Sequence, residues 1–144
     1  MSDLCDKTAV ELRRLIGRKD ISPVELLESC ITRIEATDGA VNAVVTRAFD
    51  RAQDEALHAE KAVLKGEELG LLHGLPVGIK DLEATSGIRT TLGSALYADH
   101  IPTKDQGSVA NIRAEGGIII GKTNTPEFGA GANTRNLVFG ATGN

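Results

Sequence analysis

Apolar side chains recur at helical spacing through most of the first 65 residues, with charged residues between them. Residues 8–18 predict one helix, because apolar positions three and four apart lie on one helix face. The segment SPVE at residues 22–25 predicts the start of a second helix, through a capping box with proline in the first turn. Gly39 is expected to end that helix, and the apolar run at residues 41–45 predicts a strand. A third helix is predicted over residues 47–65, where recurring alanines allow close packing.

The pattern becomes that of a strand in residues 71–81, LLHGLPVGIKD. Leu75, Val77 and Ile79 occupy alternate positions, a period typical of a short strand. The run ends on Lys80, a lysine in otherwise apolar surroundings. A lysine held at a strand end and partly desolvated has a lowered pKa, so it can act as a base near neutral pH. The alternative is a solvated lysine at a strand end, and the pattern alone leaves both interpretations open.

The remaining pattern predicts an α/β sheet. Residues 82–100 mix threonine, serine and glycine, which is typical of turns and a hairpin near the rim of an active site. Residues 105–115 predict a short helix with Asp105 as its cap. Residues 118–120 are three consecutive isoleucines, and an apolar run without alternation indicates a strand covered on both faces. The order strand, loop, helix, strand favours an α/β sheet.

Residues 116–123, GGIIIGKT, match the phosphate-binding pattern GxxxxGK[ST]. A P-loop requires a strand before its first glycine and a helix after its threonine, so that backbone amides surround the phosphates. Here a predicted helix precedes the first glycine, and the isoleucines take the positions of the exposed loop. Pro126 and Gly129 also disfavour a long helix after Thr123. The match therefore does not predict nucleotide binding.

The composition is that of one ordinary globular domain, with 144 residues, 41% hydrophobic and 25% charged. Aromatic residues make up only 3%, and the net charge is −4. A nucleic-acid surface needs stacking aromatics or positive charge, so this class of protein is disfavoured. No apolar run approaches about 18 residues, and the N-terminus lacks the pattern of a signal peptide.

Other side chains offer weaker chemistry. Cys5 and Cys30 form no CxxC or metal-binding spacing, and we interpret them as reduced structural thiols of a cytoplasmic protein. No pair of histidines has helical ligand spacing, so no metal site is predicted, and hydrogen-bonded or surface roles are expected for His58, His73 and His100. Composition leaves a Ser–His–Asp triad open, but there is no GxSxG motif. Turn or cap roles are expected for Ser86, Ser94 and Ser108.

The glycine-rich segment GKTNTPEFGAG, residues 121–131, follows the isoleucine strand. Open α/β sheets bind ligands beyond the carboxyl ends of their strands, so this segment is a candidate substrate-lining loop. The alternative is a tight connection to the next element. Spacing favours neither.

Four segments resemble the amidase signature family. They are SPVELLESCITRIEATDGAVNAVV at 22–45, GLPVGIKD at 74–81, TTLGS at 90–94, and GGIIIGKTNTPEFGAGANTRNLVFGATGN at 116–144. The resemblance covers essentially the whole chain. It implies an α/β fold with a mixed β-sheet covered by helices on both faces. It also implies hydrolysis of an amide carbon–nitrogen bond through a Ser–cis-Ser–Lys triad and an acyl-enzyme.

The resemblance also implies roles for individual residues. Lys80 matches the family's catalytic lysine, a neutral amine that acts as general base through a bridging serine. Residues 127–131 match the border of the acyl pocket, which makes Gly129, Ala130 and Gly131 the implied substrate-binding residues, with Gly129 nearest the substrate. The implied partner is a small-molecule amide, with no cofactor, no metal, and no direct contact with nucleic acid or membrane. The oligomeric state stays open, a homodimer included.

Both catalytic serines of the family belong to a later GGSSGG-like segment, and the chain ends at Asn144 without it. We therefore expect residues 1–144 to be the N-terminal part of a single amidase domain, truncated and inactive alone. Within it, residues 1–70 would be a mainly helical leader and residues 71–144 the start of the α/β core. A sheet edge is expected to stay uncovered. Two alternatives remain: the glutaminase subunit of a tRNA-dependent amidotransferase, which needs partner subunits, and an inactive fragment that only binds or assembles.

Overall fold

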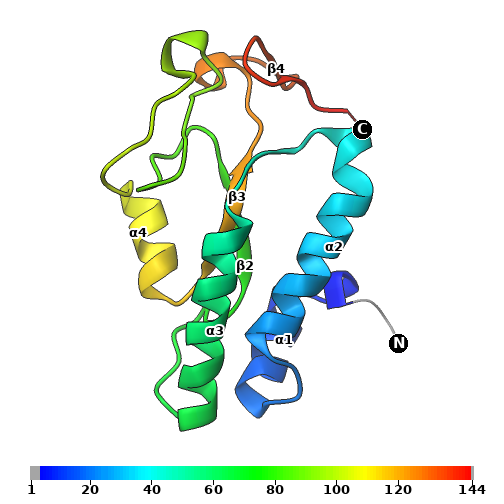
Figure 1. Ribbon diagram of the computed structural model, residues 1–144, viewed down its shortest axis with the longest axis vertical. Coiled ribbons are helices and arrows are strands. Elements are labelled where there is room, and N and C mark those ends of the chain that lie inside the picture. The colour runs from blue at the N-terminus through cyan, green and yellow to red at the C-terminus, as the bar shows by residue number, and fades with distance from the viewer. Residues whose placement is uncertain (1–3, 144) are drawn as a thin grey trace.

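The computed structural model describes residues 4–143, in which helices surround a small mixed sheet (Figure 1). The helices are α1 (Ala9–Arg18), α2 (Pro23–Val41), α3 (Phe49–Lys65) and α4 (Gly107–Ala114), with short 3₁₀ turns η1 (Leu4–Asp6), η2 (Ala95–Tyr97) and η3 (Glu127–Gly129). The strands are β1 (Val44–Arg47), β2 (Pro76–Lys80), β3 (Ile118–Thr123), β4 (Arg135–Asn136) and β5 (Gly140–Ala141). Residue 144, on which the truncation prediction falls, lies outside the described residues.

The start of α2 confirms the predicted capping box. The Glu25 backbone N–H donates to Ser22 Oγ at 3.1 Å, and the Ser22 backbone N–H donates to Glu25 Oε2 at 2.7 Å. Thr8 and Glu11 form the same box at the start of α1. Each such cap is typically worth about 1 kcal/mol. None of the helices within residues 4–143 is long and apolar enough to cross a membrane.

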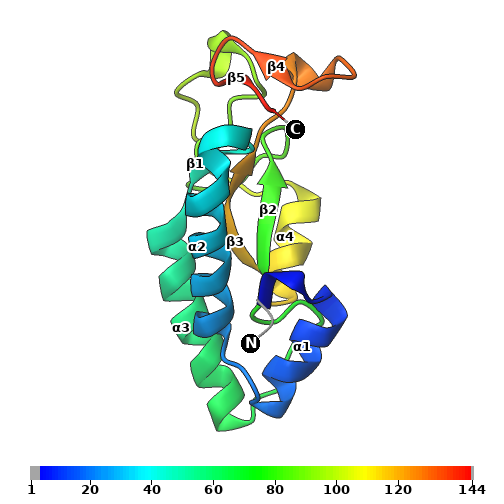
Figure 2. The same cartoon turned by 90° about the vertical axis from the view of Figure 1, so that its right-hand side faces the viewer.

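Strand β3 is the centre of a three-stranded sheet with the order β1-β3-β2 (Figures 1 and 2). It runs parallel to β2 and antiparallel to β1. The parallel register places Ile79 beside Lys122 and Lys80 beside Thr123. Within the described residues β2 has a strand partner on one side only, so its outer edge is uncovered, as expected.

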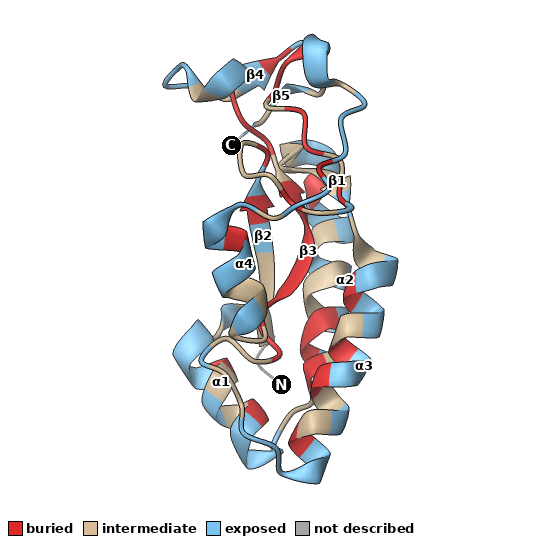
Figure 3. Cartoon of the chain, turned by 90° about the vertical axis from the view of Figure 1, so that its left-hand side faces the viewer, coloured by how far each residue is buried: buried red, intermediate tan, exposed pale blue. Residues whose placement is uncertain are grey.

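Helices cover both faces of the sheet (Figure 3). Successive isoleucines of β3 point to opposite faces, so each face carries buried apolar side chains against which helices pack. Ile118 and Ile120 pack with α2 and with the alanines of α3. Ile119 packs on the other face, in a cluster that includes Val109 of α4. The expectation of a strand buried on both sides is confirmed. Shortening one of these isoleucines to valine typically costs about 1 kcal/mol.

A separate apolar cluster joins the N-terminal helices to the segment that enters β2. Its buried members are Leu12, Ile16, Leu26, Val63 and Leu75. The last of these immediately precedes Pro76, the first residue of β2. The helices thus position the strand that carries Lys80.

The prediction that Gly39 ends α2 is wrong, because the helix continues to Val41. Asn42 takes the left-handed conformation (φ 56°), and its backbone N–H donates to Asp38 O at 2.7 Å. The Asp38 carboxylate then accepts the next two backbone N–H groups through Oδ1, at 2.7 and 3.0 Å. The Asn42 backbone and the Asp38 side chain end the helix, and a glycine inside its last turn costs only about 1 kcal/mol.

Two predictions for the crossover are also wrong. Residues 82–100 contain turns and η2 but no hairpin. Asp105 does not cap α4, which begins after Gln106. Asp105 Oδ1 instead accepts the Ser86 backbone N–H at 2.7 Å, and its Oδ2 pairs with Arg113 Nε at 3.1 Å. Partners distant in sequence outcompete the local cap for this carboxylate.

Candidate functional site

Lys80 is the last residue of β2, at the carboxyl end of a parallel strand, where open α/β sheets bind ligands. Its backbone carbonyl accepts the Glu83 N–H at 3.0 Å, which closes a tight turn directly after the strand. The residue is exposed, so the partial desolvation expected of it is not found in the described chain. Lys80 is therefore a reachable amine on a firmly held backbone.

Asp81 anchors the backbone immediately after Lys80 and is fully buried. Its carboxylate accepts the Thr91 backbone N–H at 3.1 Å and the Thr91 hydroxyl at 2.5 Å. Its own backbone N–H donates to Thr123 O at 2.9 Å, and its carbonyl accepts the Leu92 N–H at 3.0 Å. These bonds close residues 81–91 into a loop that begins beside Lys80.

The predicted substrate-binding loop packs against the same turn. Gly129 has a positive φ of 73°, and a Cβ on it would lie 2.8 Å from Leu82 Cδ1. The Phe128 backbone N–H donates to Leu92 O at 2.8 Å, while Ala130 and Gly131 are exposed. The structure therefore places Phe128 and Gly129 against the loop that follows Lys80.

Lys122 of β3, beside Ile79 in the register, is a second lysine at this end of the sheet. It is 0% exposed. Its ammonium donates three hydrogen bonds: to the Glu83 carbonyl, to Thr85 Oγ1 at 2.7 Å and to Thr90 Oγ1 at 3.1 Å. Lys122 is thus bound to the interior of the loop that Asp81 closes.

Burial changes the chemistry of the Lys122 amine. Desolvation lowers the pKa of Lys122 to about 8, against the opposing influence of Asp81, Glu83 and Asp105. It is therefore still mainly an ammonium at pH 7. Sequence reasoning missed this residue because it lies in the segment that matches the P-loop pattern. The signal that was available is a lysine two residues after a run of three isoleucines.

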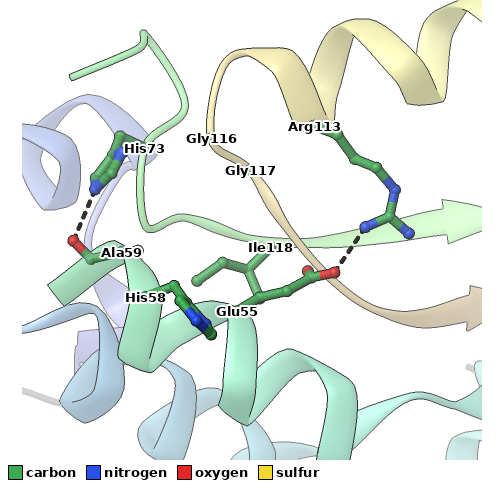
Figure 4. A pocket seen from close by; sticks show the side chains of 8 residues that line it. All are labelled: Glu55, His58, Ala59, His73, Arg113, Gly116, Gly117 and Ile118. Carbon is green, nitrogen blue, oxygen red and sulfur yellow. Dashed lines mark hydrogen bonds and ion pairs between the residues drawn. The ribbon is translucent and has the colours of Figure 1, made fainter. Parts of the chain in front are cut away.

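A cavity of about 400 Å³ lies between α3 and the turn from α4 into β3 (Figure 4). Its lining residues are Glu55, His58, Ala59, His73, Arg113, Gly116, Gly117 and Ile118. Glu55 Oε1 and Arg113 Nη1 pair at 2.7 Å along its wall. Ile118 is the first residue of β3 and pairs with Pro76, so the cavity lies at the amino ends of the parallel strands. It is separate from the Lys80 end.

Two of the three histidines are hydrogen-bonded to backbone carbonyls, as predicted. His58 Nδ1 lies 2.7 Å from Asp54 O, and His73 Nε2 lies 2.9 Å from Ala59 O. Within residues 4–143, no group of three His, Cys, Asp or Glu side chains is placed to hold a metal ion.

Comparison with known proteins now defines the class. A family model described as Amidase matches residues 25–144, and the chain therefore belongs to the Amidase family. One of the subunits of glutamyl-tRNA(Gln) amidotransferase from Geotalea daltonii is 39% identical over 142 residues, which cover 99% of this chain and 29% of that protein. An acylamidase from Rhodococcus erythropolis is 40% identical over 139 residues, which cover 95% of this chain and 29% of that protein. The chain thus spans 29% of the length of these relatives.

A solved structure supports the same assignment. The crystal structure of a bacterial aryl acylamidase of the amidase signature family superposes with a TM-score of 0.91 at 36% identity. The match covers 96% of this chain and 29% of that one. The predicted α/β fold with a mixed sheet is confirmed.

Proposed function

We propose that these residues belong to an amidohydrolase in which Lys80 is the general base. The observation that carries the proposal is the position of Lys80, exposed at the carboxyl end of β2 and followed by the buried, hydrogen-bonded Asp81. Membership of the Amidase family supports the reaction class. The match of the GIKD segment to the family's catalytic lysine supports the role of this residue.

The proposed reaction proceeds by a proton relay. The neutral amine of Lys80 accepts a proton from a bridging cis-serine, which takes the proton of a nucleophilic serine. The nucleophile bonds to the amide carbonyl carbon, the carbon–nitrogen bond breaks, and the leaving amine takes up the proton. Water then hydrolyses the acyl-enzyme through the same relay and releases a carboxylic acid. Both serines would be supplied by a Gly/Ser-rich segment outside these 144 residues.

Residues 127–131 would border the acyl part of the substrate, with Gly129 nearest. The contact between Gly129 and Leu82, two residues after Lys80, supports this assignment. In this proposal residues 1–70 are the leader and residues 71–144 the start of the core of one amidase domain. The leader also contributes β1 to the sheet, which supports a single domain.

A second candidate is the amidase subunit of a tRNA-dependent amidotransferase. Several similar proteins are named as subunits of glutamyl-tRNA(Gln) amidotransferase, and this favours glutamine as the amide. Partner subunits would then be required. A third candidate, a role only in binding or assembly, is favoured by the uncovered edge of β2.

The test compares two substrates in a protein that carries this chain together with the serine segment. Release of aniline from a simple anilide indicates a stand-alone amidase, and release of ammonia from glutamine only with partner subunits indicates the second candidate. Lys80→Ala should abolish the observed activity, while Lys61→Ala, an exposed lysine of α3, should leave it unchanged. Normal turnover by the Lys80→Ala variant would contradict the proposed base. No turnover of either amide by the unaltered protein would favour the third candidate.

A further inference from the structure

The proposed reaction does not use Lys122, although burying an unneeded lysine is costly. The hydrogen-bond donors around it are all assigned. The Thr85 hydroxyl donates to Glu83 O at 3.0 Å, and the Thr90 hydroxyl donates to Ile88 O at 3.0 Å. Each hydroxyl proton is therefore already donated to a backbone carbonyl, so both hydroxyl oxygens can only accept hydrogen bonds from Lys122. Its three contacts require all three ammonium protons, so only the charged form makes all three hydrogen bonds.

Because all three ammonium protons of Lys122 are used in hydrogen bonds, Lys122 is excluded as a base for the substrate. Its side chain is fully buried beneath residues 83–90, and each of its protons already has an acceptor. A base needs a free lone pair that reaches the reacting atoms. Lys122 offers neither access nor a lone pair while the loop is in place.

Glu83 connects the two lysines through its backbone. Its carbonyl accepts a hydrogen bond from the Lys122 ammonium, and its N–H donates to the Lys80 carbonyl at 3.0 Å. The loop of residues 81–91 is closed by Asp81 and Thr91, so Lys122 is the internal support of a loop whose first turn begins at Lys80.

We propose that Lys122 is a positioning residue for Lys80, which holds the 83–90 segment and thereby the turn that orients the general base. This inference rests on the proposed amidohydrolase function. Charged groups facing Lys122 are the carboxylates of Asp81 and Glu83 in this loop and of Asp105 before α4. Above pH 8 the amine keeps two protons for three acceptors, and one support of the loop is lost.

The experiment measures kcat and KM against pH in a protein that carries the chain and the serine segment. Lys122→Met should lower kcat by about tenfold with KM changed less than about twofold, because misorientation of a base affects the chemical step. The unaltered protein should show a decline of kcat above pH 8 that Lys122→Met lacks. Thr85→Val and Thr90→Val, which each remove one acceptor and retain the charge, should lower kcat by about threefold.

The proposal is overturned if Lys122→Met, shown to be folded by circular dichroism, retains the normal kcat and the alkaline decline. If Lys122→Met does not fold, the two threonine variants decide: normal kcat in both overturns the proposal. Lys80→Ala in the same assay distinguishes a failure of the proposed amidohydrolase function from a failure of the positioning role of Lys122. Activity that survives Lys80→Ala contradicts the proposed function, whereas activity lost with Lys80→Ala but unaffected at Lys122, Thr85 and Thr90 contradicts only the positioning role.

Discussion

Lys80 and Lys122 lie on neighbouring parallel strands, one register position apart, yet they occupy opposite environments. Lys80 is exposed at the end of β2, whereas Lys122 is fully buried and donates to three acceptors. The buried lysine has a lowered pKa, whereas the lysine that we propose as the general base is the exposed one. A perturbed pKa therefore marks a candidate site only together with access and a free lone pair.

The largest expected effect separates the charge of Lys80 from its basicity. Lys80→Arg keeps a cation at the end of β2 but cannot become a neutral base, because the pKa of arginine is above about 12. Turnover in the protein that supplies the serine segment should fall by about 10²- to 10⁴-fold, the usual contribution of a general base. Lys61→Arg on α3 is the matched control. Retention of more than about a tenth of the turnover would show that positive charge, and not basicity, is what matters at residue 80.

A second expected effect concerns the anchor between the two lysines. Asp81→Ala leaves the buried Thr91 backbone N–H without its carboxylate acceptor. The free energy of unfolding, measured by urea denaturation, should fall by about 3 kcal/mol. Asp81→Asn, which keeps an acceptor oxygen, should lose less. Equal losses in the two variants would mean that the hydrogen bonds to Thr91 do not anchor the loop.

A third expected effect is a pH dependence that only Lys122 supplies. Its pKa is lowered from 10.5 to about 8 in the folded chain, so the unfolded chain binds more protons between these pH values. The free energy of unfolding should therefore rise with pH in that window, by at most about 1.4 kcal/mol per pH unit. Deprotonation removes a buried charge, which stabilises the folded chain, and one hydrogen bond, which destabilises it. The lowered pKa means that the stabilising effect is the larger of the two. The rise should be absent in Lys122→Met, and an identical rise in that variant would assign it to other groups.

The smallest expected effect compares two glycines with positive φ. Gly129→Ala places a Cβ 2.8 Å from Leu82, whereas Gly140→Ala, at φ 83°, meets nothing within 4 Å. Both substitutions should cost about 1 kcal/mol for the left-handed backbone, and Gly129→Ala should cost about 1 kcal/mol more for the contact. Thermal unfolding of the two variants measures the difference. Equal losses would mean that residues 127–131 do not pack on the turn that follows Lys80.

Local signals predicted the elements that carry the site. The alternation of Leu75, Val77 and Ile79 indicated β2, the isoleucines indicated β3, and the capping box of residues 22–25 marked the start of α2. These patterns depend on neighbours within a few residues, so a sequence displays them directly.

The errors concern residues whose partners are distant in the chain. Asp105 resembles a helix cap but bonds to Ser86 and Arg113. Gly39 is the exception, because Asp38 and Asn42, which end the helix after Val41, are its near neighbours in the sequence. Lys122 was hidden in the same way as Asp105, because its acceptors lie more than 30 residues earlier in the chain. The partners of these polar groups are set by tertiary structure, which periodicity does not reveal.

Native-state acylation of lysines, read by mass spectrometry, tests the contrast between the two lysines most directly. At neutral pH, Lys80 should react with an amine-directed ester as fast as the exposed lysine of α3 at residue 61. Lys122 should stay unmodified until the chain is unfolded, because its three protons are bound and its side chain is buried. Modification of Lys122 at the rate of Lys80 in the folded protein would contradict the account.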